Sequence, residues 1–318
     1  MPSLTSASRI LPGSPGAPEP MTAVSAWLAA IRPRTLGLSV SPVLVGTALA
    51  VADGNGFRPL PFLLALGAAM LIQIGTNLHN DVADFRKGID GTDRLGPPRA
   101  TAQGWLSAEA VERAAWMVFA LVFLLGIGLS VIGGWPIVLL GLCSLSAAVA
   151  YSGGPWPLSS RPVGELFVFL FFGLAAVGGS YYLQAGYFTG SALLAGALMG
   201  LPAAAVLVVN NYRDRFSDER AGRRTLAVLL PEWASRWEYA LFLSVPFLLL
   251  PSLFEEGWFV LLPELLVIPA SMLIVRLFRV RNGVALNELL ARTASFQLVL
   301  GLLLSVALLG QGLYDASY

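Results

Sequence analysis

The chain has 318 residues, of which 56% are hydrophobic and only 12% are charged. Soluble globular domains carry about 25% charged residues, so this composition excludes an ordinary soluble protein and indicates a polytopic membrane protein. The net charge is +1, and the chain has no basic patch with interleaved aromatic residues, so nothing indicates nucleic-acid binding.

The N-terminal residues 1–22 are rich in Pro, Ser, Gly and Ala and lack the apolar core of a signal peptide. We expect a disordered tail there, followed by one transmembrane domain over residues 23–318. A short amphipathic stretch, 26–31, opens this domain and is expected to lie at the membrane interface.

Apolar segments of spanning length recur along the rest of the chain. A segment inside lipid has to satisfy its own backbone hydrogen bonds, so we expect helices and an all-α fold. The predicted spans are 35–53, 60–80, 111–132, 135–151, 164–184, 190–211, 238–254, 257–278 and 293–313. With nine spans, nearly all arginines fall on the side of the N-terminus, which predicts that this side faces the cytoplasm.

A polar stretch over residues 77–90 ends the second predicted span. If the helix continues through it, Asn77, Asp81 and Asp84 fall at i, i+4 and i+7 and share one face. An acid near the membrane centre costs roughly 2.5–3.5 kcal/mol on insertion scales, and less towards the interface. Two carboxylates at this position therefore indicate a functional site.

The same pattern nearly repeats at the end of the sixth predicted span. There Asn210, Asp214 and Asp218 fall at i, i+4 and i+8, again on one face. A single aspartate at either place could equally be a helix cap or one side of an interfacial salt bridge. Two such clusters at equivalent helix ends favour two halves of one site.

Acidic and basic residues alternate in the loops that follow these two helix ends. Aspartates without cysteine or a suitable histidine nearby are hard oxygen ligands, which suit Mg²⁺ and not zinc. Protein-bound magnesium is usually completed by water and substrate phosphate, and arginines make forked contacts with phosphate oxygens. The pattern predicts a Mg²⁺–diphosphate site, and the predicted metal-binding and catalytic residues are Asp81, Asp84, Asp214 and Asp218.

Substrate contacts are expected from the same two regions and from the end of the fourth span. The residues expected to bind diphosphate are Arg86, Lys87, Arg223 and Arg224. Further predicted substrate-binding residues are Asn77, Asn80, Arg94, Arg99, Tyr151, Arg161, Asn210 and Arg213. Glu165 follows Arg161 closely, and we expect an ion pair at the interface there.

At these residues the sequence resembles the UbiA superfamily of intramembrane aromatic prenyltransferases, from about Trp27 to the C-terminus. The superfamily's first motif, Asn-Asp-x-x-Asp-x-x-x-Asp, matches Asn80, Asp81 and Asp84, with Gly88 at its last position and Asp90 nearby. The second motif, Asp-x-x-x-Asp, matches Asp214 and Asp218. The stretches that look like the branch acting on 1,4-dihydroxy-2-naphthoate in menaquinone synthesis are 32–36, 80–90, 93–97, 151–155 and 213–227.

The resemblance implies a bundle of nine transmembrane helices around a central cavity, in a bacterial cytoplasmic membrane. Two Mg²⁺ ions held by the motifs would bind the diphosphate of a polyprenyl donor, and the isoprenoid tail would lie in a groove open to membrane lipid. The metals and basic residues would stabilise the departing diphosphate. An electron-rich dihydroxynaphthoate would then attack and lose CO₂, with its carboxylate oriented by Arg94, Arg99 and Arg161.

Two alternatives remain at this point. A prenyltransferase of the same superfamily could use another acceptor, such as 4-hydroxybenzoate, homogentisate or haem. An ion-coupled transporter also places acids within membrane helices, although it would be expected to carry them deep in the spans. Here the acids gather at one end, beside basic loops.

Overall fold

The computed structural model describes residues 21–89, 94–254, 258–280 and 283–317, so the predicted tail falls almost entirely outside the described residues. Over the described ranges the chain forms helices without strands, which confirms the all-α fold. The helices are α1 (Ala23–Ile31), η1 (Pro33–Thr35), α2 (Gly37–Ala50), η2 (Val51–Asn55), α3 (Pro59–Arg86), α4 (Ala108–Gly133), α5 (Trp135–Ser152), η3 (Leu158–Ser160), α6 (Gly164–Val168), η4 (Phe169–Ala175), α7 (Ala176–Ala185), α8 (Gly190–Arg220), α9 (Leu226–Leu229), α10 (Glu232–Leu249), η5 (Leu250–Leu253), α11 (Leu261–Glu264), α12 (Val267–Arg279) and α13 (Ala285–Asp315).

Within the described residues, eight helical segments are long and apolar enough to cross a membrane. They correspond to eight of the nine predicted spans. The remaining predicted span, 238–254, corresponds to α10 followed by η5. The helix α10 has only 18 residues and three of them, Glu232, Arg236 and Glu238, are charged. The longer α4 also begins with charged residues but continues for 26 residues, so it retains a long apolar stretch.

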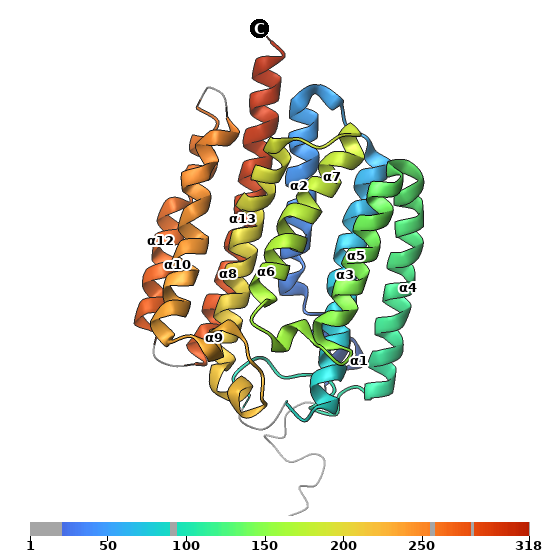
Figure 1. Cartoon of the computed structure of the whole chain (residues 1–318), viewed down its shortest axis with the longest axis vertical. Coiled ribbons are helices and arrows are strands. Elements are labelled where there is room, and N and C mark those ends of the chain that lie inside the picture. Colours follow the sequence, from blue (N-terminus) through green and yellow to red (C-terminus); the bar gives the residue numbers. More distant parts are fainter. Residues whose placement is uncertain (1–20, 90–93, 255–257, 281–282, 318) are drawn as a thin grey trace, which may run out of the picture.

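The long helices lie side by side along a common direction (Figure 1). The pair α10 and α12 forms one flank of the bundle and the pair α4 and α5 forms the other. Between them, α8 and α13 pack against each other and against α2. In the most apolar stretch of α8, 72% of the residues are buried, against 22% in α4. Thus α8 is enclosed by protein, whereas α4 presents most of its surface outward, where lipid would lie.

Close backbone contact joins α8 to the π-helical segment η4. A Cβ atom on Gly173 would lie 2.5 Å from the carbonyl oxygen of Gly196, and one on Gly200 would lie 2.7 Å from the carbonyl oxygen of Phe169. Only glycine permits this approach, as is common between membrane helices. The contact fixes the position of η4 and of the aromatic side chains next to it.

The two helices that carry the acidic clusters are each longer than the hydrocarbon core of a membrane is thick. With a rise of 1.5 Å per residue, the 28 residues of α3 span about 42 Å and the 31 residues of α8 about 46 Å. Both exceed the hydrocarbon core of about 30 Å. Their C-terminal ends lie at the same end of the bundle (Figure 1). Because α3 ends at Arg86 and α8 at Arg220, both helices continue past their acidic residues, as expected.

Candidate active site

A cavity of about 1160 Å³ runs from the acid-bearing ends of α3 and α8 into the bundle. Its walls include residues of α1, η1, α2, α3, α4, α5, α6, η4, α7, α8 and α13. Charged and amide side chains line the end near the two acidic clusters, and aliphatic and aromatic side chains line most of the remaining length. The cavity could therefore hold a molecule with a charged head and a long apolar tail.

Three of the polar residues predicted on α3 line this cavity: Asn77, Asn80 and Asp84. Successive residues of an α-helix are rotated by about 100°, so Asp84 lies between Asn77 and Asn80 on the helix surface. The Nδ2 of Asn77 donates a hydrogen bond to the carbonyl oxygen of Ile31, 2.8 Å away. The Oδ1 of Asn80 accepts one from the hydroxyl of Ser152.

Asp81, which was predicted to bind metal and to act in catalysis, does not line the cavity. Asp81 lies about 100° around α3 from Asn80. Its carboxylate accepts hydrogen bonds from the backbone N–H groups of Ala100 and Thr101, each at 3.2 Å, and from the Thr101 hydroxyl. The carboxylate therefore faces a loop and is separated from the other acids.

On α8, all three predicted residues, Asn210, Asp214 and Asp218, line the cavity. The buried guanidinium of Arg213 donates to Asp214 through Nε and Nη2, at 2.8 and 2.5 Å. Its Nη1 donates to Oδ1 of Asn287 on α13, at 2.8 Å. Arg213 thus orients the Asp214 carboxylate and ties α8 to α13.

Two arginines from loops connect the acidic helix ends. The Nη2 of Arg99 lies 2.7 Å from Oδ2 of Asp84, and both side chains are buried. Arg223 forms an ion pair with the other oxygen of Asp84 and another with Oδ1 of Asp218, at 3.3 Å. The chain Arg99–Asp84–Arg223–Asp218 brings the two halves together, as the sequence predicted.

The charge state of Arg223 follows from this position. Burial by itself would lower the pKa of the guanidinium, but the carboxylates of Asp84 and Asp218 outweigh that effect and raise its pKa above the usual value. Arg223 is therefore a permanent positive charge that lies between two acidic side chains. Such a group can remain with the acids or turn towards a bound anion without changing its protonation.

Comparison with known proteins decides the family. The UbiA prenyltransferase family matches residues 39–310 of this chain. The chain belongs to the UbiA prenyltransferase family. A relative from Escherichia coli (strain K12), 1,4-dihydroxy-2-naphthoate octaprenyltransferase, is 37% identical over 290 residues, which are 87% of this chain and 93% of that protein. A relative of the same name from Haemophilus influenzae is 35% identical over 69% of this chain and 73% of its own length.

The fold agrees with this membership. A solved structure of a UbiA homolog from Archaeoglobus fulgidus, bound to DMAPP and Mg²⁺, superposes with a TM-score of 0.59. It is 15% identical in sequence, and the match covers 89% of this chain and 100% of that one. The bundle with an interior cavity is therefore a UbiA fold.

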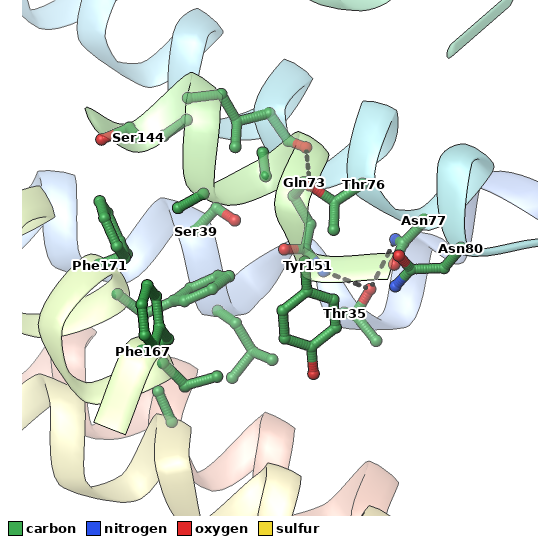
Figure 2. A pocket seen from close by; sticks show the side chains of 18 of the residues that line it. Thr35, Ser39, Gln73, Thr76, Asn77, Asn80, Ser144, Tyr151, Phe167 and Phe171 are labelled. Carbon is green, nitrogen blue, oxygen red and sulfur yellow. Dashed lines mark hydrogen bonds between the residues drawn. The ribbon is translucent and has the colours of Figure 1, made fainter. Parts of the chain in front are cut away.

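Within this UbiA bundle, Figure 2 shows polar residues along the cavity, of which Asn77 and Asn80 were predicted from the sequence and Gln73 was not. Asn77 and Asn80 lie on one side of the cavity, with Gln73 on the same helix, and Phe167 and Phe171 lie on the other. The amide groups of Gln73 and Asn77 both donate to Oγ1 of Thr35, at 3.4 and 3.3 Å. We define the polar wall as Thr35, Ser39, Gln73, Thr76 and Asn77.

The opposite side of the cavity is aromatic. The rings of Phe167 and Phe171 are stacked with centroids 6.0 Å apart, and Tyr151 lies between them and the asparagines (Figure 2). Tyr151 thus lines the cavity, as predicted. Flat apolar surfaces that face amides and hydroxyls provide a place for a planar ring that carries polar substituents.

Four predicted substrate-binding residues, Arg86, Lys87, Arg161 and Arg224, are not among the residues that line the cavity. Arg86 forms a forked pair with Glu112, at 2.7 and 2.6 Å, on the outer side of α3. Lys87 donates to the carbonyl oxygen of Ser152 at 2.9 Å, and burial lowers its pKa. Arg161 stacks over the ring of Trp156 at 4.4 Å, and Arg224 is exposed.

Arg94 and Arg99 do line the cavity, together with Arg32 and Arg34 of the loop before α2. Nε of Arg94 donates to the carbonyl oxygen of Pro97 at 3.0 Å. The loop before α2 was noted in the sequence only for its family likeness. In the structure it closes the cavity end that faces the acids.

Glu165 was expected at the interface beside Arg161, and the structure corrects this expectation. Its side chain is buried, and its Oε1 accepts a hydrogen bond from Nδ2 of Asn211 at 2.7 Å. Asn211, which lines the cavity beside Asn210, was not identified from the sequence. Asp90 and Asp93, the remaining acids of the first loop, lie outside the described residues.

Proposed function

We propose that this enzyme transfers a polyprenyl group from polyprenyl diphosphate to 1,4-dihydroxy-2-naphthoate, with loss of CO₂ and diphosphate. The observation that carries the proposal is the meeting of two acid-bearing helix ends, bridged by Arg223, at the mouth of a long apolar cavity. The names of the relatives from E. coli and H. influenzae support the naphthoate acceptor.

The residues at the helix ends fit magnesium. Asp84, Asp214, Asp218 and Oδ1 of Asn80 would hold it, and all are hard oxygen donors. Among the described residues, no three acidic, histidine or cysteine side chains meet closely enough to bind a metal by themselves. This suits Mg²⁺, because its remaining ligands are usually water and substrate phosphate. The bound ions would stabilise the negative charge that develops on the diphosphate.

The arginines around the acids would bind the donor's head. Arg99 and Arg223 already contact Asp84, so they lie at the place where the diphosphate oxygens would be. Each charge-assisted hydrogen bond would contribute about 1.5–3 kcal/mol. We therefore assign Arg99 to the diphosphate and no longer to the acceptor carboxylate. The aliphatic length of the cavity would take the polyprenyl tail.

The acceptor would lie between the polar wall and the stacked rings of Phe167 and Phe171. Gln73 and Asn77 can bond ring hydroxyls, and Oγ of Ser39 is buried without a partner among the described residues. Arg32, Arg34 and Arg94 also line this cavity and could orient the acceptor carboxylate. The C–O bond of the donor breaks, a C–C bond to the ring forms, and the bond to the carboxylate breaks and releases CO₂.

We infer that the cavity mouth faces the cytoplasm of a bacterial cell. The loops beyond α3 and α8 belong to the arginine-rich side of the predicted topology, and short cytoplasmic loops carry an excess of basic residues. The donor would fit this orientation, because a polyprenyl diphosphate would keep its tail in lipid and its head in the cytoplasmic interface.

The direct experiment uses the purified protein in lipid nanodiscs with geranylgeranyl diphosphate and dihydroxynaphthoate labelled at the carboxyl carbon. We expect labelled CO₂ and prenylated product in equal amounts, only when Mg²⁺ is present. A parallel reaction offers 4-hydroxybenzoate. Faster product formation from the benzoate would contradict the naphthoate assignment, and no product from either acceptor would contradict the prenyltransferase assignment.

A further inference from the structure

Asp81 is the most enclosed aspartate of the two motifs, with 1% of its surface exposed, and it is separated from the cavity. Both of its carboxylate oxygens are in use. Oδ2 accepts the N–H of Ala100, and Oδ1 accepts the N–H and the hydroxyl of Thr101. A carboxylate with this many donors is arranged to hold a backbone segment in place.

The segment that it holds is a tight turn over residues 99–106. The N–H of Gln103 donates to the carbonyl of Arg99 at 3.0 Å, and the N–H of Trp105 to that of Ala100 at 2.9 Å. Gly104 adopts a positive φ of 68°, which lets the chain leave the turn. The first N–H groups of such a turn have no partner within it, and Asp81 accepts them in the way that a helix N-cap does.

The turn begins at Arg99, whose guanidinium lies 2.7 Å from Asp84. Asp81 and Asp84 are one helical turn apart on α3. Two residues of α3 therefore contact the turn. Asp81 accepts hydrogen bonds from its backbone, and Asp84 pairs with the side chain of its first residue, Arg99. The position of Arg99 beside the acids depends on both contacts.

We propose that Asp81 is a positioning residue, which fixes the 99–106 turn so that Arg99 stays on Asp84 at the diphosphate end of the cavity. The role of Arg99 towards diphosphate rests on the proposed function, whereas the link between Asp81 and the turn does not. By this account the first motif contains two kinds of aspartate. Asp84 faces the substrates, and Asp81 supports the loop that completes the site.

The test uses Asp81→Asn, Thr101→Val, the double variant and Thr101→Ser. An asparagine keeps one acceptor oxygen and places an NH₂ group against a backbone N–H, and valine keeps the shape of Thr101 without its hydroxyl. Thr101→Ser retains the hydroxyl and is the matched control. Hydrogen exchange of the peptide over 99–106 is measured without substrates, and the kinetic constants are measured separately.

We expect exchange over 99–106 to be about tenfold faster in Asp81→Asn, with a smaller increase in Thr101→Val and wild-type exchange in Thr101→Ser. The donor KM should rise about tenfold in Asp81→Asn, with kcat and the Mg²⁺ half-saturation concentration little changed. The double variant should match Asp81→Asn, because residues that act as a unit are not additive.

Two results would overturn the proposal. The first is wild-type exchange over 99–106 in Asp81→Asn, which would show that the carboxylate does not hold the turn. The second is a raised Mg²⁺ half-saturation concentration in Asp81→Asn, together with wild-type kinetics in Thr101→Val, which would make Asp81 a metal ligand. If the wild-type protein prenylates no acceptor, the proposed function fails, and the exchange experiment still decides the role of Asp81.

Discussion

The ends of α3 and α8 nearly repeat each other in sequence but differ in how they use their acids. On α8, Asp214 and Asp218 both line the cavity, and arginines pair with both. On α3 the corresponding pair with a spacing of four is Asn80 and Asp84, an amide and an acid. Asp81, the second acid of α3, faces the 99–106 turn.

This difference shows that spacing along the helix determines which side chains face the cavity together. The nearby loop determines the contacts of an acid that faces elsewhere, such as Asp81. Residues four apart differ by about 40° around the helix, so Asn80 and Asp84 share one face of α3, and Asp214 and Asp218 share one face of α8. A third acid falls to the side of that pair. On α3 a loop returns past this side and supplies backbone N–H groups to it.

The largest effect is expected where the two helix ends are equivalent. Asp84→Asn and Asp218→Asn should each lower kcat/KM by about 100-fold or more, roughly 2.7 kcal/mol in the transition state. Each change removes a carboxylate that faces the site and also leaves Arg223 with one partner fewer. Steady-state kinetics in nanodiscs at saturating Mg²⁺ would measure the loss.

The control for this comparison is folding. Elution of both variants as a single species, with thermal unfolding close to that of the wild type, would exclude a general loss of structure. Near-normal kcat/KM in either variant would show that the two ends are not equivalent and would remove that carboxylate from the site.

Asn80→Ala should have the next largest effect, a loss of about tenfold in kcat/KM with a higher Mg²⁺ half-saturation concentration. The alanine removes an oxygen that faces the cavity at the position equivalent to Asp214. Asn80→Asp keeps that oxygen and is the matched variant, expected to retain more activity than Asn80→Ala. Equal losses in the two variants would argue against a ligand role for the Asn80 oxygen.

Arg223 and Arg224 are adjacent in the chain, but only Arg223 lines the cavity. Comparing their substitutions therefore distinguishes direct contact with the donor from the overall charge of the loop. Arg223→Gln should raise the donor KM about tenfold or more, because a charge-assisted contact of roughly 1.5–3 kcal/mol is lost. Arg224→Gln should change it little, since this side chain is exposed and does not line the cavity. Equal increases in the two variants would mean that overall loop charge attracts the donor.

The smallest effect is expected on the outer side of α3. Arg86 and Glu112 form an exposed pair, with 53% and 37% of their side chains accessible, and such pairs contribute about 0–1 kcal/mol. Arg86→Gln should therefore leave the donor KM unchanged and lower the free energy of unfolding by at most about 1 kcal/mol. A raised donor KM in this variant would restore Arg86 to the diphosphate site.

The sequence predicted the bundle and the meeting of the two helix ends because both follow from periodic properties. Apolar runs of spanning length indicate helices, and acids four apart at helix ends share a face. The orientation of Asp81 could not be predicted, because it depends on a loop that returns about twenty residues later in the chain. Arg161 stacks on Trp156 in the segment between α5 and α6, where no long helix gives a periodicity that would predict which side chains meet.

Apart from Asn77, the residues of the polar wall were not predicted from the sequence, for another reason. Gln73 and Ser39 are single polar residues within apolar helices, and such residues more often complete helix packing than bind a ligand. Only the structure places both of them in the lining of the same cavity as Phe167 and Phe171. Glu165 was misplaced because its partner Asn211 is distant in the chain.

The most direct test of the joint site is equilibrium binding of labelled geranylgeranyl diphosphate to the protein in nanodiscs, with and without Mg²⁺ and without acceptor. The wild-type protein should bind the donor in a Mg²⁺-dependent way. Asp84→Asn and Asp218→Asn should each weaken this binding at least about tenfold, whereas Asp81→Asn should keep its dependence on Mg²⁺. Wild-type Mg²⁺-dependent binding by either Asp84→Asn or Asp218→Asn would contradict a diphosphate site formed jointly by the two helix ends.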